Sequence, residues 1–177
     1  YRISRYLSGA ACLALLITGA AVIPQINRGQ QEPTSGQEMV GVVNGMETVA
    51  SAEELSQKVG VPVSDLKDLP FTVEYTKYTN GWGEFAQIDY EGVDADGDAQ
   101  SLCYRKGTGE DDISGDYNVY EIEEAVDVTG TQVTLKGSAD GYALAVWNEG
   151  GYAYAVSVTK KITKDEILQI VEEIVKK

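Results

Sequence analysis

The sequence predicts an α+β domain: an antiparallel sheet of about seven strands (a meander) with a C-terminal helix packed on one face and a short N-terminal helix, preceded by one transmembrane helix. Three patterns support this prediction. Residues 6–23 contain no charged side chain. From residue 71 onward, apolar and polar residues alternate with the period of two that is typical of half-buried strands. Two Ser/Thr-x-x-Glu boxes, at Ser51 and Thr163, each precede apolar residues with helical spacing.

The uncharged segment 6–23 has the length of a membrane-spanning helix. Its 18 residues would extend roughly 27 Å as an α-helix, close to the hydrocarbon thickness of a bilayer. Arg2 and Arg5 precede it, which indicates that this side is cytoplasmic. The alternative is a secretion signal that is cleaved after the small residues 18–20. A lipoprotein signal at Cys12 is disfavoured because the usual leucine three positions upstream is absent.

These features predict four parts of the chain. The third part, residues 24–48, is rich in Pro, Gln, Gly and Ser. It has too few apolar residues to offset the entropy of ordering, so it is expected to be a flexible linker. With an uncleaved anchor, the protein is a single-pass membrane protein whose C-terminal domain is extracytoplasmic; with a cleaved signal, the domain is secreted. The parts are a cytoplasmic flank (1–5), a transmembrane anchor or signal segment (6–23), the linker (24–48) and an extracytoplasmic α+β domain (49–177).

Helix and strand signals follow one another along the predicted domain. A helix over 52–59 is expected to end at Gly60, and a further short turn is expected at 64–69. The first strand begins at Phe71 and ends at a turn at 79–81, which contains the hairpin signal Asn-Gly. The remaining strands are expected at residues 82–90, 99–106, 117–128, 131–136, 142–147 and 152–158.

The last two predicted strands contain small residues that are expected to share one face. A helix can approach such a face closely, and the helix that begins after Thr163 has apolar residues at i, i+3, i+4 and i+7. The C-terminal helix is therefore predicted to cover the sheet over these small residues. They are Ala143, Ala145, Ala153, Ala155 and Ser157.

The charge distribution excludes some partners. The chain has a formal net charge of −14, and residues 29–177 carry 11 basic and 28 acidic residues, a net charge of −17. Nucleic-acid binding requires clusters of Lys and Arg, and so does attachment of a surface to anionic lipid. Neither function fits residues 29–177, so the expected membrane contact is through 6–23 alone.

Few residues qualify for catalysis or metal binding. The chain has no histidine, which excludes Ser-His-Asp and Cys-His catalysis and zinc sites with His ligands. Cys103 is predicted to be an ordinary half-buried strand residue. Asp94, Asp96 and Asp98 are weak calcium candidates, because an EF-hand loop would need glycine and glutamate where Ala99 and Arg105 stand. No catalytic residue and no cofactor is predicted.

Several stretches resemble a known family. They are WNEGGYAYAVS at 147–157 with the capped helix after it, AQIDY at 86–90 and LCYRK at 102–106. Together they resemble a bacterial domain of unknown function found on the outer side of membrane-anchored, anti-sigma-factor-like proteins of Gram-positive bacteria. The resemblance covers about residues 51–177. It implies an extracytoplasmic domain in envelope signalling, and no catalytic residues are established for the family.

The functional hypothesis is a membrane-anchored sensor or binding domain. Its ligand would be a protein, a peptide or an envelope component. The domain itself would have no enzymatic activity. Two alternatives stay open at this point. One is a secreted or anchored hydrolase that uses paired carboxylates, and the other is a calcium-stabilised structural module.

Overall fold

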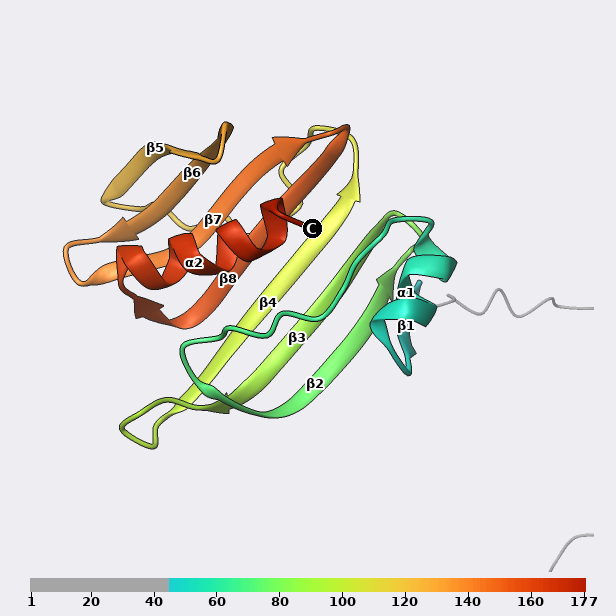
Figure 1. The fold of residues 1–177 in the computed structure, drawn as a ribbon, viewed down its shortest axis with the longest axis horizontal. Helices are drawn as coiled ribbons and strands as arrows, with labels where there is room; N and C mark the ends of the chain where they lie inside the picture. The colour runs from blue at the N-terminus through green and yellow to red at the C-terminus, as the bar shows by residue number, and fades with distance from the viewer. Residues whose placement is uncertain (1–44) are drawn as a thin grey trace, which may run out of the picture. The chain divides into compact units, whose positions relative to one another are not determined.

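The computed structural model describes residues 45–177, which form eight β-strands and two α-helices (Figure 1). The predicted flank 1–5, the predicted transmembrane or signal segment 6–23 and residues 24–44 of the predicted linker lie outside the described residues. Within residues 45–177, no helix combines the length and the hydropathy that a membrane span needs. The elements are β1 (Met46–Val49), α1 (Ala52–Val59), β2 (Thr72–Gly81), β3 (Phe85–Val93), β4 (Ala99–Thr108), β5 (Ile122–Val128), β6 (Thr131–Ser138), β7 (Gly141–Glu149), β8 (Tyr152–Ile162) and α2 (Lys164–Val175).

The described strands form one antiparallel sheet in the order β1-β2-β3-β4-β8-β7-β6-β5. This confirms the α+β class and the antiparallel sheet, which has eight strands where about seven were predicted, but the prediction that the strands form a single meander is wrong. β1–β4 form one meander, β5–β8 form a second, and the two meet where β4 pairs with β8. The connection 109–121 takes the chain to the far edge, so that β8 returns to the middle (Figure 1). The extra strand β1 overlaps residues 46–48 of the predicted linker and pairs with β2.

The first hairpin turn lies later than predicted. β2 continues through Asn80 and Gly81, and residues 82–84 make the turn. Trp82 and Gly83 have φ values of 55° and 75°, in the left-handed region. The Asn80 side chain accepts a hydrogen bond from the Gly83 N–H at 2.8 Å. The Asn-Gly signal was correct about a turn, but Asn80 stabilises this turn from the end of the preceding strand.

Strand β5 begins at Ile122, five residues after the predicted start. The preceding residues alternate in sequence but do not form a strand. Tyr117 and Val119 are 95% and 99% exposed. The Tyr120 hydroxyl donates to the Asp116 carboxylate at 2.5 Å. The segment is thus held by local hydrogen bonds, and its alternation does not mark a buried face.

The last hairpin has a shorter turn than predicted, and its strand pairing shows that the small residues do not share one face. Gly150 and Gly151 form a two-residue loop with φ values of 59° and 82°, which is the backbone of a type I′ turn. Ala145 therefore lies opposite Val156, and Ala155 opposite Val146. Since opposed residues point to the same face, Ala145 of β7 lies on the face opposite to Ala153 and Ala155 of β8. The predicted patch of small residues under the C-terminal helix does not exist.

Both helices begin at the predicted caps. The Thr163–Glu166 box is complete: the Thr163 side chain accepts from the Glu166 N–H, and the Glu166 carboxylate accepts from the Thr163 N–H. At α1, Ser51 accepts from the Glu54 N–H, but the Glu54 carboxylate accepts from the N–H of Ala50 instead of Ser51. The predicted turn at 64–69 is absent, because these described residues form no helix or hydrogen-bonded turn.

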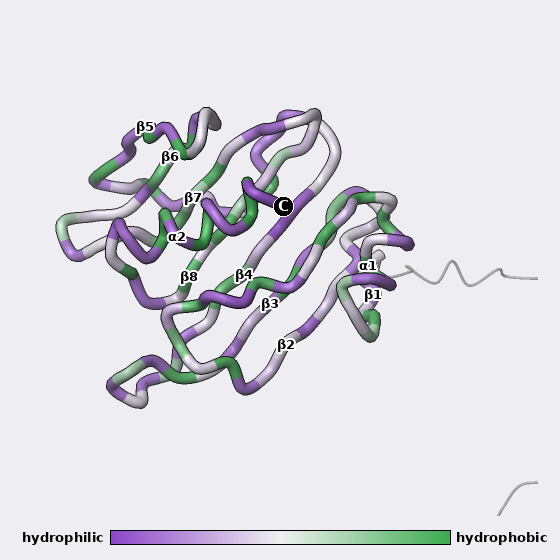
Figure 2. Tube along the Cα trace, in the orientation of Figure 1, coloured by the Kyte–Doolittle hydropathy of each residue, from purple (hydrophilic) through white to green (hydrophobic). Residues whose placement is uncertain are grey.

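One face of the sheet is covered by α1, by the segment 60–71 and by α2 (Figure 1). α1 packs on β2 and β3, and α2 packs on β5, β7 and β8. Figure 2 shows apolar and polar positions alternating around α2, as expected for a helix with one buried side. The core between α2 and the sheet includes Leu135, Ala145 and Val156 of the strands and the buried side of the helix, Ile167, Ile170, Val171 and Ile174.

Candidate functional site

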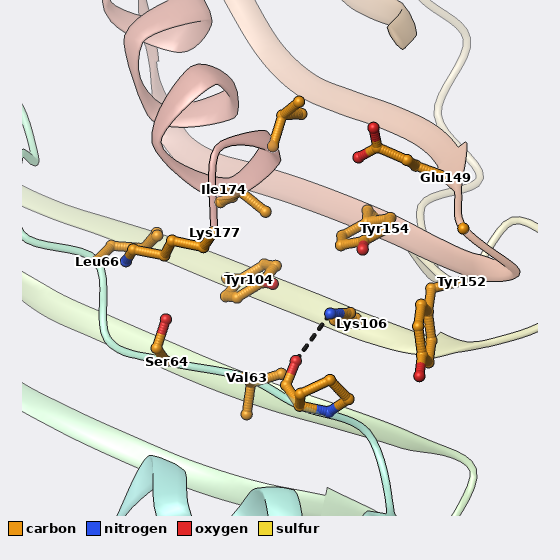
Figure 3. A pocket seen from close by; sticks show the side chains of 13 residues that line it. Val63, Ser64, Leu66, Tyr104, Lys106, Glu149, Tyr152, Tyr154, Ile174 and Lys177 are labelled. Atoms are coloured by element: carbon orange, nitrogen blue, oxygen red, sulfur yellow. Dashed lines mark hydrogen bonds between the residues drawn. The ribbon is translucent and has the colours of Figure 1, made fainter.

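A groove opens between the C-terminal end of α2 and the segment 62–66 (Figure 3). Its volume is about 370 Å³. β4 and β8 form its floor through Tyr104, Lys106 and Tyr154. Figure 3 also shows Tyr152 and Glu149 on its rim, next to the β7–β8 turn. The apolar walls are Pro62, Val63, Leu66, Ile174 and Val175.

The strand register explains why the floor residues come together. Tyr104 and Lys106 are two residues apart on β4, so they point to the same face. Lys106 lies opposite Tyr154 of β8, and Tyr154 lies opposite Trp147 of β7. Tyr104 lies opposite the buried Val156 in the neighbouring row. The groove therefore depends on the β4–β8 pairing, which joins the two meanders.

The wall formed by the segment 62–66 is fixed by hydrogen bonds from several elements. The Ser56 hydroxyl of α1 accepts a hydrogen bond from the Val63 N–H at 2.9 Å, and its single hydrogen is shared between the carbonyls of Ala52 and Val63, at 2.8 and 3.1 Å. The Tyr90 hydroxyl of β3 accepts from the Leu66 N–H at 2.9 Å, in a buried position. The Lys106 ammonium donates to the Pro62 carbonyl at 2.8 Å. The wall is held in place although it contains no regular secondary structure.

Lys106 is a half-buried cation surrounded by aromatic rings. Its Nζ lies 4.6 Å from the ring centre of Tyr152 and 5.1 Å from that of Tyr154, within the range of cation–π attraction. Burial lowers the pKa of Lys106, and the negative charge of Glu149 opposes this effect. No carboxylate of the described residues lies within ion-pair distance of this ammonium.

The tyrosines of the groove provide hydroxyl groups. Tyr154 stacks on Trp147, with ring centres 4.9 Å apart and an interplanar angle of 5°. Among the described residues, no protein group hydrogen-bonds to the hydroxyls of Tyr104, Tyr152 or Tyr154. Burial raises the pKa of Tyr104 and of Tyr154, so both hydroxyls stay protonated and can donate.

Glu149 is the only carboxylate among the residues that line the groove. It accepts a hydrogen bond from the Thr131 hydroxyl at 2.7 Å. A hydrolase of the predicted alternative kind would need two facing acids. The groove does not offer this arrangement.

The predicted calcium candidates lie elsewhere, in the β3–β4 loop. Asp94 accepts from the N–H groups of Asp96 and Asp98 at 3.0 and 2.9 Å. Asp94 and Asp98 both form an ion pair with Lys160, and the hydrogen bond from Lys160 lowers the pKa of Asp94. A protein ammonium thus neutralises two of the three candidates. Residues 45–177 contain no group of three or more Asp, Glu, His or Cys residues arranged to hold a metal ion.

Cys103 is half-buried, as predicted. Burial, with a smaller contribution from Asp89, raises its pKa to about 12. It alternates with Leu102 and Tyr104 along β4, so it points to the face opposite the groove. The thiol and the groove are separate features.

The groove residues do not stand out as a site in the sequence. Strands that carry the family resemblance contain them, in a pattern that indicates a structural role: Tyr104, Lys106, Tyr152 and Tyr154. The available signal was the spacing Tyr-x-Lys on one strand and Tyr-x-Tyr on another, which places each pair on one face. The pairing of these strands was not predictable from that spacing.

Comparisons of the chain with models of protein families, with curated proteins and with solved structures found no match. The resemblance to the outer domain of anti-sigma-factor-like proteins therefore stays a prediction.

Proposed function

We propose that this protein is a membrane-anchored binding or sensor protein, whose extracytoplasmic domain receives its ligand in the groove between α2 and the segment 62–66. The observation that carries the proposal is the set of unpaired polar groups around the groove. The hydroxyls of Tyr104, Tyr152 and Tyr154 have no protein partner in the described region. Ligand sites combine apolar walls with a few convergent polar groups in this way.

A binding function fits this groove better than catalysis. Its lining contains one carboxylate, Glu149, and the chain has no histidine to serve as a general base. Lys106 and the tyrosines can donate hydrogen bonds and hold a ligand. The wall at 62–66 is also held by hydrogen bonds from α1, β3 and β4. A preformed wall limits the ordering cost of binding.

Binding can be tested with the purified full chain in nanodiscs. Saturation-transfer NMR would screen small molecules of four classes: carboxylates, carboxamides, amines and neutral sugars. Ser64 is exposed and lines the groove, so Ser64→Trp should block the groove and abolish the signals of the bound molecules. Gln132→Trp, at an exposed position outside the groove, is the matched control. Signals that persist in Ser64→Trp, or no signals with any class, would contradict the proposal.

The location outside the cytoplasm is supported by the uncharged segment 6–23 and the preceding arginines. An amine-reactive reagent that cannot cross membranes tests it on intact cells that express the full chain. Lys160 and Lys161 are exposed in the structure, so peptides that contain them should carry the label. Cells opened before labelling are the control for reactivity. Labelling only after the cells are opened would contradict the predicted topology.

A further inference from the structure

The polar groups of the groove are mostly hydrogen-bond donors. The Lys106 ammonium has three donors and gives one hydrogen bond, to the Pro62 carbonyl at 2.8 Å. The Tyr104 and Tyr154 hydroxyls are donors without a protein partner in the described region. The carboxylate of Glu149 already accepts from Thr131. A ligand that matches this groove must therefore supply an acceptor.

The positive charge of Lys106 indicates that the acceptor group of the ligand is an anion. A half-buried ammonium without an ion-pair partner is costly, because burial removes water and the charge of Glu149 replaces its stabilisation only in part. The lowered pKa of Lys106 has this origin. The other lysine at the groove, Lys177, is already engaged by the carboxylate of Glu173 and the carbonyl of Asp65, at 2.8 and 2.7 Å. Residues 45–177 carry 11 basic and 26 acidic residues, a net charge of −15, so Lys106 is a local positive site on an acidic domain.

The apolar walls of the groove indicate that the ligand also has an apolar part. Leu66 and Ile174 are buried side chains that face the groove from opposite walls. The volume of about 370 Å³ is larger than a small inorganic anion needs. The apolar part of a ligand would pack between these walls while its anionic end reaches Lys106.

We propose that the groove binds a carboxylate attached to an apolar body, and this inference depends on the proposed binding function. The carboxylate accepts hydrogen bonds from Lys106 and from the hydroxyls of Tyr104 and Tyr154. The apolar body packs on Leu66 and Ile174. Two sources share this chemistry: the carboxyl terminus of a peptide with an apolar last residue, and a free organic acid.

The test uses matched probes and the full chain in nanodiscs. Titration calorimetry compares the peptide Gly-Gly-Ala-Leu as the free acid with the same peptide as its C-terminal amide. Loss of a charge-assisted hydrogen bond should weaken the amide about tenfold or more. Octanoate, with octanamide as its matched amide, tests the free-acid source. Binding of the peptide acid or of octanoate, with weaker binding of its amide, supports the inference and identifies the source.

Variants of Lys106 test the role of the cation. Lys106→Met keeps the apolar stem and should remove the preference for acid over amide. Lys106→Arg keeps the charge and should retain that preference. Lys161→Met is the control on the sheet outside the groove. Wild-type binding of the acid should also decrease as the pH rises through the lowered pKa of Lys106, whereas binding to Lys106→Arg should not.

The failure of this inference differs from the failure of the proposed function. Equal binding of acids and amides, or groove binding by neutral sugars or amines with no binding of acids, overturns the inference and leaves the binding function intact. An unchanged acid preference in Lys106→Met also overturns it. If no class of molecule binds in a manner blocked by Ser64→Trp, the proposed function itself is wrong.

Discussion

Tyrosine hydroxyls have two different roles in this domain. The hydroxyl of Tyr90 is buried and accepts a hydrogen bond from the Leu66 N–H, which joins the sheet to the segment over it. The hydroxyls of Tyr104 and Tyr154 face the groove and have no protein partner in the described region. The first kind satisfies a backbone group that would otherwise lose its hydrogen bond on folding. The second kind is available to a ligand.

At the residue scale, we predict that Tyr90→Phe destabilises the domain. The substitution leaves the Leu66 N–H buried without an acceptor, so the free energy of unfolding should decrease by about 1–3 kcal/mol. Urea denaturation of the wild type and the variant measures this change. Tyr117→Phe is the control, because Tyr117 is 95% exposed and its hydroxyl can bond to water. Equal stability of Tyr90→Phe and the control would mean that the Leu66 N–H finds another acceptor.

The position of α2 depends on one carboxylate as well as on its apolar side. Glu173 accepts hydrogen bonds from the backbone N–H groups of Lys67 and Asp68 at 3.0–3.2 Å. It also accepts from the Lys177 ammonium at 2.8 Å. Burial opposes ionisation of Glu173, but these three donors outweigh it and lower the pKa. α2 and the segment 60–71, which form the two walls of the groove, are thereby joined.

At the element scale, Glu173 should make the docking of α2 dependent on pH. Its folded pKa lies below the ordinary value of 4.5, so its stabilisation is present above about pH 4.5 and is lost as the pH falls through the folded pKa. Glu173→Gln should lower the free energy of unfolding by about 1–2 kcal/mol near neutral pH. The difference from the wild type should shrink toward zero at lower pH. Chemical denaturation at several pH values measures both curves.

Glu172→Gln is the matched control for this experiment. Glu172 forms an exposed ion pair with Lys176 one turn away on the same helix, and such pairs contribute little to stability. Its unfolding curve should follow the wild type within about 0.5 kcal/mol at every pH. If Glu173→Gln and Glu172→Gln behave alike, the hydrogen bonds to Lys67 and Asp68 do not stabilise the docked helix.

At the scale of the whole molecule, local patterns predicted elements better than they predicted their arrangement. The cap at Thr163 and the turn at Thr129-Gly130 were predictable because a few neighbouring residues determine them. The pairing of β4 with β8 was not, because it joins residues about 50 positions apart and depends on the course of the connection 109–121. The groove combines residues of both meanders with α2, so it could not be predicted without that pairing.

The small residues of the last hairpin were predicted to share one face, and the parity of the strand pairing excludes this. With strands that end at 147 and begin at 152, Ala145 would lie opposite Tyr154, so Ala145 and Ala155 would point to opposite faces. The observed two-residue loop moves the pairing of Ala145 by two positions, to Val156, and leaves the faces unchanged. The alternation within each strand was correct, but the patch did not follow from the predicted turn. The core under α2 instead includes Trp147 and Tyr154, and Tyr154 also lines the groove.

The sheet order predicts a gradient of local stability, and hydrogen exchange can measure it. β4 and β8 lie in the middle of the sheet, and each pairs with a neighbour on both sides. β1 and β5 are the edges, where each described strand has one neighbour. Backbone amides of Tyr104 and Val156 should therefore exchange only through global unfolding, with the highest protection in the domain. Amides of β1 and β5 should exchange through local opening, because one side of each strand is not paired within the described sheet.

This gradient distinguishes one cooperative sheet from two meanders that fold separately. If the β4–β8 pairing joins the halves into one unit, the protection of β4 and β8 should equal the free energy of unfolding from denaturation. Measurements at two pH values should confirm that the exchange rates report the equilibrium between the folded and the opened states. If β2–β3 and β6–β7 were instead more protected than β4 and β8, each meander would be stable alone. The groove would then lie at the least stable strand pairing of the sheet. A ligand that contacts β4 and β8 would raise the protection of both strands, because it binds only the state in which they are paired.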